Sequence, residues 1–170
     1  DVGLDFWFLV LVVGMALVFD YINGFHDAAN AIATVVATKV LSPRTAVIYG
    51  AFFNFVGALM GTEVAATVGK GLVEQASITM ETLFCALIGA ITWNLITWYK
   101  GLPSSSSHAL IGSLVGATFF SAPAQAGNKL VEGWRNIHWD ALMEKVVLPM
   151  VTSPVAGVVG GFLVMLALTD

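Results

Sequence analysis

The stretch that decides the fold class runs from residue 6 to residue 38 and reads FWFLVLVVGMALVFDYINGFHDAANAIATVVAT. It contains no Lys or Arg, and its acidic and histidine side chains are Asp20, His26 and Asp27. Because about 20 helical residues at about 1.5 Å each cross a bilayer core of about 30 Å, the stretch is long enough to span a membrane. It is too long for one straight span, and Asn23 and Gly24 weaken a helix near its middle. We therefore expect a bent or interrupted first helix.

The rest of the chain is similarly poor in charge. Further runs without Asp, Glu, Lys or Arg cover residues 45–62, 82–99, 101–128 and 146–169. Of the 170 residues, 58% are hydrophobic and 11% are charged, whereas a soluble domain has about 25% charged residues. A chain of this composition cannot give a soluble core a polar surface. We predict an all-α integral protein of the cell membrane, with residues 1–170 forming a single multi-pass domain in the lipid bilayer.

The charge-free runs predict a bundle of about five transmembrane segments. We place them at residues 6–38, 45–68, 82–99, 108–121 and 146–168. The third and fourth either both span the membrane or form a re-entrant hairpin with its tip at residues 103–107; we favour the hairpin because it brings that tip opposite Asp27. Residues 125–145 contain Trp and basic side chains, which predicts an amphipathic segment at the lipid headgroups. Pro149 predicts a kink near the start of the last segment.

Glycines at small-xxx-small spacing predict close packing between helices. The pairs are Gly57 with Gly61, Gly112 with Gly116, and Gly157 with Gly161.

Polar residues in the first segment follow a helical period. Asp20, Asn23, Asp27, Asn30 and Thr34 are spaced by 3, 4, 3 and 4, which places them on one helix face. Carboxylate and amide oxygens suit Na⁺, and a carboxylate could instead carry a proton. Asn94 and Thr97 are candidates to complete the coordination from the third segment. We predict that the coupling cation involves Asp27, Asn23, Asn30, Asn94 and Thr97, with any Na⁺ at Asp27, Asn30 and Asn94, and that the protein has no other metal and no cofactor. The alternative is that these residues only form hydrogen bonds between helices.

A second polar group, Pro103 to His108, precedes an apolar segment that is rich in Gly. It contains four consecutive serines, Ser104 to Ser107. Ser is a good helix N-cap, and a helix N-terminus presents unpaired N–H groups to an anion. Transporters hold anionic groups at such interrupted helices. We therefore predict an anion site at this turn, with a simple capped loop as the alternative.

These two groups resemble the signature motifs of a known family. Residues 23–31, NGFHDAANA, resemble the GxxDxxNA motif of the PiT-type inorganic phosphate transporters. Residues 92–94, TWN, and residues 98–108, WYKGLPSSSSH, resemble the second motif of that family, with Lys100 where an apolar residue is usual. The likeness extends over nearly the whole chain, including Phe53-Asn54-Phe55, and bacterial low-affinity phosphate permeases are the most similar members.

The resemblance implies a symporter that brings inorganic phosphate inward with Na⁺ or H⁺. It also implies two inverted repeats. Because this chain holds one copy of each motif, it resembles the N-terminal repeat of a longer transporter. Its partner would then be the C-terminal repeat of the same transporter. Carried over to this sequence, Asp27 and Asn30 would help bind cation and phosphate. Ser105, Ser106 and Ser107 would contact phosphate. A homodimer is a further assembly to consider.

Other functions fit the sequence less well. A permease for a related oxyanion such as sulfate would use the same features, but phosphate at neutral pH still carries a proton that a facing Asp27 could accept. An intramembrane serine hydrolase could pair Ser104 with His108, four residues apart. It would also need an orienting acid, and the sequence places none beside His108. We therefore predict that the protein is not an enzyme. With seven Lys and Arg in total and no basic patch, we expect no nucleic-acid partner.

Overall fold

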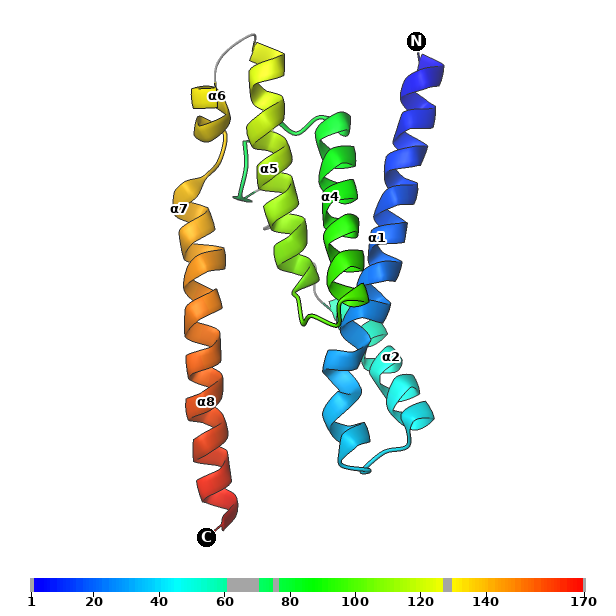
Figure 1. The fold of residues 1–170 in the computed structure, drawn as a ribbon, viewed down its shortest axis with the longest axis vertical. Coiled ribbons are helices and arrows are strands. Elements are labelled where there is room, and N and C mark those ends of the chain that lie inside the picture. Colours follow the sequence, from blue (N-terminus) through cyan, green and yellow to red (C-terminus); the bar gives the residue numbers. More distant parts are fainter. Residues whose placement is uncertain (1, 61–70, 75–76, 127–129, 170) are drawn as a thin grey trace. The chain divides into compact units, whose positions relative to one another are not determined.

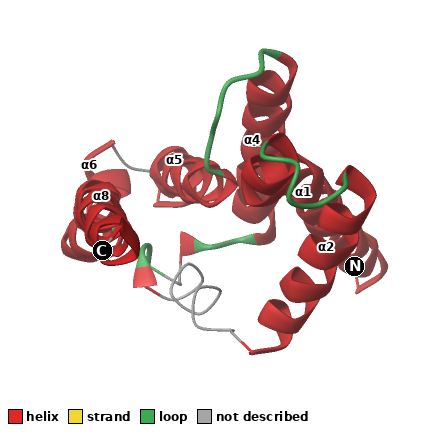
Figure 2. Ribbon diagram, turned by 90° about the horizontal axis from the view of Figure 1, so that it is seen from below, coloured by secondary structure: helices red, strands yellow, loops and turns green. Residues whose placement is uncertain are grey.

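The computed structural model describes residues 2–60, 71–74, 77–126 and 130–169. Within these ranges the chain consists of helices and their connections (Figure 2). Its strand-type pairing is an isolated bridge between Val73 and Ile137. Helices long and apolar enough to cross a membrane lie at residues 3–37, 80–99 and 139–169. The prediction of an all-α integral membrane fold is confirmed. The chain divides into two units, Asp1–Ile137 and His138–Asp170, which are described separately below.

The first helix, α1, is one helix of 36 residues, Val2–Ala37. At about 1.5 Å per residue it is about 54 Å long, well beyond the thickness of a bilayer core. Of the two expected forms, bent or interrupted, an interruption at Asn23 and Gly24 is wrong, because helical structure continues through both residues. A single Gly lowers helix stability by only about 1 kcal/mol. Burial of Ile22 and His26 on either side of the pair opposes a break.

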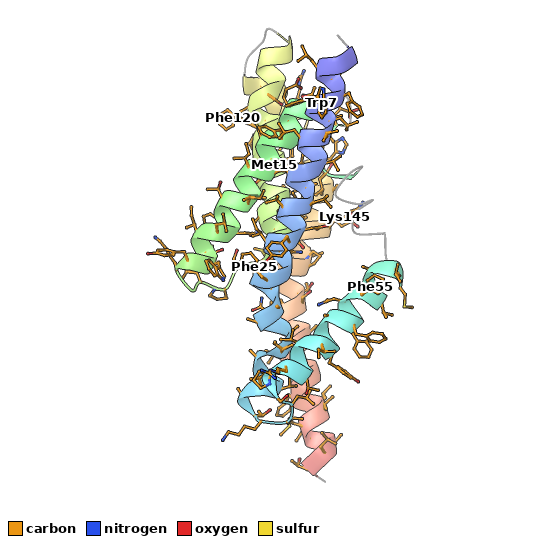
Figure 3. All side chains as sticks on the ribbon, turned by 90° about the vertical axis from the view of Figure 1, so that its right-hand side faces the viewer. Trp7, Met15, Phe25, Phe55, Phe120 and Lys145 are labelled. Atoms are coloured by element: carbon orange, nitrogen blue, oxygen red, sulfur yellow. The ribbon has the colours of Figure 1, made fainter. Side chains whose placement is uncertain are left out.

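One face of α1 packs against α4, which spans Met80–Tyr99. The buried residues of α1 are spaced by 7, 3 and 4 positions, as on one helix face: Val12, Phe19, Ile22 and His26. The two helices run in the same direction, since ring pairs join Phe8 to Phe84 and Phe25 to Trp98. In Figure 3 the labelled Trp7, Met15 and Phe25 mark successive levels along α1.

Helix α2, Pro43–Met60, folds back along the C-terminal part of α1 (Figure 1). The turn between them places Lys39 at a φ of 59°, a left-handed conformation that ends many helices. Ser42 then caps α2, because its hydroxyl accepts a hydrogen bond from the backbone N–H of Thr45 at 3.3 Å. The second predicted segment extends to residue 68, and its residues 61–68 lie outside the described residues.

Helix α5, Ser106–Ala126, forms an antiparallel hairpin with α4 (Figure 1). Helix α4 ends at Tyr99. Two residues later Gly101 has a φ of +64°, which suits glycine, and the N–H of Leu102 donates to the carbonyl of Thr97 at 2.8 Å. The tip of the hairpin meets α1 at Asp27, about three helical turns before α1 ends. A re-entrant hairpin would have its tip beside the middle of a membrane-spanning helix, and the tip lies in such a position on α1.

Close helix approaches occur at other glycines than those predicted. A Cβ added at Gly57, Gly112, Gly116, Gly157 or Gly161 would meet nothing within 4 Å, and Gly61 lies outside the described residues. A Cβ added at Gly89 of α4 would lie 3.0 Å from the hydroxyl oxygen of Ser113 on α5. Helix α6, Leu130–Arg135, approaches α5 at Gly133, where an added Cβ would overlap the carbonyl oxygen of Phe119.

The second unit is a single helical run. It comprises α7 (Trp139–Leu142), a π-helical turn (Met143–Val147) and α8 (Leu148–Thr169). The π turn lies immediately before Pro149, whose ring cannot donate a backbone hydrogen bond and crowds the preceding turn. It marks the point at which we predicted a kink. Helix α8 has no buried residue in this unit, so its apolar surface needs lipid or protein to cover it.

Candidate functional site

The two sequence motifs meet in one hydrogen bond. Ser106 is the first residue of α5, and its hydroxyl donates to Oδ2 of Asp27 at 2.7 Å. Ser106 is 3% exposed, whereas the side chain of Asp27 is 38% exposed. The carboxylate of α1 therefore lies at the N-terminus of α5, where unpaired N–H groups and the helix dipole favour negative charge. The structure thus brings together Asp27 and Ser106 as the resemblance implied.

His26 contacts the other oxygen of this carboxylate. Its Nδ1 lies 2.9 Å from Oδ1 of Asp27, and its Nε2 lies 3.1 Å from the hydroxyl of Thr97 on α4. The side chain of His26 is 5% exposed. Sequence reasoning did not select His26 as a site residue. The signal that could have found it is its place on the buried stripe, four residues after Ile22 and directly before the motif acid.

Two amide side chains near this network have buried atoms without partners. Asn94 is fully buried, and neither its Oδ1 nor its Nδ2 has a hydrogen-bond partner. Oδ1 of Asn23 is likewise buried and unpartnered. Asn94 lies one turn before Thr97 on α4, and Asn23 lies one turn before Asp27 on α1. Since buried polar groups are normally satisfied, these oxygens are suitable ligands for a small cation.

Asn30, one turn after Asp27, is exposed in this unit. It lines a pocket of about 230 Å³ together with His26, Thr97 and residues 101–103, which connect α4 to the serine run. The pocket gives His26 and Asn30 a shared opening. Two further members of the predicted polar face, Asp20 and Thr34, are exposed and lie away from these contacts. The middle of that face, and not its whole length, adjoins the hairpin.

The other serines of the tip have distinct neighbours. Ser105 caps α5, because its hydroxyl accepts from the backbone N–H of His108 at 3.3 Å and also lies 2.7 Å from Nδ1 of that histidine. Ser104 accepts a hydrogen bond from the indole N–H of Trp93 at 3.1 Å. Ser107 is exposed. Ser105 is therefore the N-cap of α5, Ser106 and Ser107 begin its first turn, and Ser104 is held against α4.

Comparisons with known proteins agree with these motifs. A sequence model described as the phosphate transporter family matches residues 23–170. A probable low-affinity inorganic phosphate transporter of Streptomyces halstedii is 46% identical over 164 residues, which cover 95% of this chain and 71% of that protein. A protein of the same description from Rhizobium meliloti is 46% identical over 167 residues, covering 98% of this chain and 47% of that protein.

A more distant relative is the low-affinity inorganic phosphate transporter of Escherichia coli. It is 36% identical over 181 residues, which cover 97% of this chain and 34% of that protein. The chain thus spans less than half the length of the Rhizobium and Escherichia relatives. No solved structure matches the chain.

Proposed function

Because this chain belongs to the phosphate transporter family, we propose that it takes part in the symport of inorganic phosphate across the cell membrane, driven by Na⁺ or H⁺. The relatives carry names that state low-affinity inorganic phosphate transport. The proposal assigns the cation to Asp27, Asn23, Asn30, Asn94 and Thr97. It assigns phosphate to the first turn of α5, with Asp27 and Asn30 beside it.

The observation that carries this proposal is the hydrogen bond from Ser106 to Asp27. A serine hydroxyl has one proton to donate, so Ser106 cannot serve Asp27 and an incoming anion at the same time. An ionised Asp27 at the N-terminus of α5 also repels a second anion. A cation that neutralises Asp27 removes this repulsion and frees the hydroxyl. Binding of the cation therefore favours binding of phosphate, which is the linkage that symport requires.

Neutral donors suit a carrier that must release its cargo. The first turn of α5 offers hydroxyls and backbone N–H groups, and it contains no Arg or Lys. A bidentate Arg would bind phosphate more strongly and make release harder. The unpartnered oxygens of Asn23 and Asn94 support a cation site beside this anion site.

We also propose that the chain is the N-terminal repeat of a longer transporter. Its coverage of the Rhizobium and Escherichia relatives, 47% and 34%, supports this reading. In an alternating-access site at a repeat interface, the second repeat would then cover Asn30 and Ser107, which are exposed here.

A permease for sulfate is the alternative within this class. The Ser104–His108 pair considered for a hydrolase is not formed, because Ser104 is bonded to Trp93 and His108 is bonded to Ser105. The test is uptake of radiolabelled phosphate by the full-length transporter in proteoliposomes, with Na⁺ and pH gradients imposed separately and with excess sulfate as competitor. Uptake driven by one gradient and resistant to sulfate is expected. Gradient-independent leakage contradicts symport, and inhibition by sulfate favours the alternative.

A further inference from the structure

His26 has the most constrained position of the polar residues around Asp27, and neither motif role assigned above uses it. Its ring bridges two helices, with Asp27 of α1 at 2.9 Å on one side and Thr97 of α4 at 3.1 Å on the other. The side chain is 5% exposed, so the contacts are shielded from competing water. Both ring nitrogens have a polar partner, as a buried imidazole requires, and one of the two partners is the carboxylate of Asp27.

We propose that His26 is a positioning residue for phosphate symport, which holds Oδ1 of Asp27 so that Oδ2 alone faces Ser106 and the coupling cation. The inference rests on the function proposed above. It assigns to His26 no contact with phosphate and no contact with the cation.

The donor pattern fixes the direction of this bridge. An ionised carboxylate only accepts hydrogen bonds, so Nδ1 of His26 carries the proton that Asp27 accepts. In the neutral ring, Nε2 accepts from the hydroxyl of Thr97. In the protonated ring, Nε2 donates to Thr97, whose hydroxyl then turns to the carbonyl oxygens of Trp93 and Asn94, at 3.0 and 3.1 Å. Nδ1 faces Asp27 in both states, so the positioning does not depend on the charge of the ring.

The bridge has a consequence for coupling. Asp27 is 38% exposed, and a carboxylate in that position could rotate freely if nothing held it. Oδ1 is held by His26, which is itself bonded to α4. The packing of α1 against α4 therefore determines where Oδ2 lies, and the hairpin tip does not. A change at Ser106 is then felt at Oδ2 alone, through the bond of 2.7 Å. Without His26, Ser106 would hold the carboxylate through Oδ2 with Oδ1 released from α4, and we expect the cation to bind more weakly.

Two conservative variants separate positioning of Asp27 from helix packing. In His26→Asn the amide nitrogen takes the place of Nδ1 and keeps the bond to Asp27. In His26→Gln it takes the place of Nε2 and keeps the bond to Thr97, hence the link between helices. We expect His26→Asn to retain the cation affinity of the parent. We expect His26→Gln to raise the half-saturating cation concentration by about ten-fold, because Asp27 loses one hydrogen bond to its charged carboxylate.

The measurement is the initial rate of radiolabelled phosphate uptake by the full-length transporter in proteoliposomes, with the driving cation varied at fixed phosphate. The reverse order of the two variants overturns the proposal and makes His26 a packing residue. Equal values in the two, whether equal to the parent or equally impaired, also overturn it. Absence of uptake by the parent would instead be a failure of the function proposed above.

Nitrogen NMR of the histidine-labelled transporter gives a second readout that does not depend on uptake. The His26 signal is assigned by its loss in His26→Asn. We expect Nδ1 of His26 to be protonated. An unprotonated Nδ1 overturns the proposal, because such a ring cannot donate to Asp27.

Discussion

Ser106 donates a hydrogen bond of 2.7 Å to Asp27 across 79 residues of sequence, and this bond joins the N-terminus of one helix to the interior of another. Each residue comes from a different family motif. In this contact Asp27 occupies the hydroxyl that an incoming phosphate would use, so a cation that neutralises Asp27 would favour binding of the anion.

Replacing Asp27 by Asn is expected to abolish coupled phosphate uptake while leaving the protein folded. The shape of the side chain barely changes, but the variant can neither compensate a bound Na⁺ nor carry a proton. Asp20→Asn is the matched control, because Asp20 is exposed on the same helix and lies two turns from the contact. Its uptake should stay close to that of the parent. Similar, small losses in both variants would show that the polar residues of α1 are structural.

Residues 1–170 alone, purified and reconstituted, are expected not to accumulate phosphate. A site at the interface between repeats needs both halves, and Asn30 and Ser107 are exposed in the unit described here. The measurement is phosphate accumulation in proteoliposomes under the gradient that drives the full-length transporter, with cross-linking to determine the oligomeric state. Accumulation by a monomer contradicts the repeat-interface proposal, whereas accumulation by a dimer shows that a second copy can replace the missing half.

Gly133→Ala is expected to destabilise the protein, because the new methyl group would overlap the backbone carbonyl of Phe119. Overpacking of this kind costs about 1–3 kcal/mol. Gly112→Ala is the control, since a Cβ at Gly112 meets nothing within 4 Å and Ala favours the helix by about 1 kcal/mol. The measurement is the thermal unfolding midpoint in detergent. A midpoint for Gly133→Ala at or above that of Gly112→Ala would show that α6 does not pack on α5 in this way.

Much of the helix pattern could be predicted from charge alone. The predicted segment 82–99 agrees with α4 to within two residues, because a charge-free run bounded by Glu81 and Lys100 leaves little choice of ends. Asn23 and Gly24 predicted an interruption that is absent from α1. Asn23 and Gly24 each lower the stability of a helix by about 1 kcal/mol at most. Burial of α1 against α4 outweighs this loss, and that burial cannot be read from the local sequence.

The site shows the same division between local and long-range information. The polar period of α1 and the serine run predicted Asp27 and Ser106, since both follow from spacing within one segment. The bridge through His26 could not be predicted, because it depends on the register between α1 and α4. That register is set by pairs such as Phe8 with Phe84, which lie far apart in the sequence.

Ser106→Ala is expected to change both phosphate affinity and its dependence on the cation. The variant loses a hydroxyl that can donate to phosphate, and a hydrogen bond to a charged group contributes about 1.5–3 kcal/mol. The apparent KM for phosphate should therefore rise by about ten-fold or more. Because Asp27 no longer competes for that hydroxyl, the KM should also fall less steeply than in the parent as the driving cation is raised.

Ser105→Ala and Ser107→Ala should raise the KM for phosphate by a similar factor and keep the cation dependence of the parent, because neither hydroxyl is bonded to Asp27. Ser104→Ala is the control, since Ser104 is held by Trp93 at 3.1 Å. It should have the KM of the parent. The measurement is phosphate uptake by the full-length transporter, titrated at several cation concentrations, with expression checked for each variant. If Ser106→Ala keeps both the parent KM and its cation dependence while Asp27→Asn is inactive, the anion binds elsewhere and the serine run only caps α5.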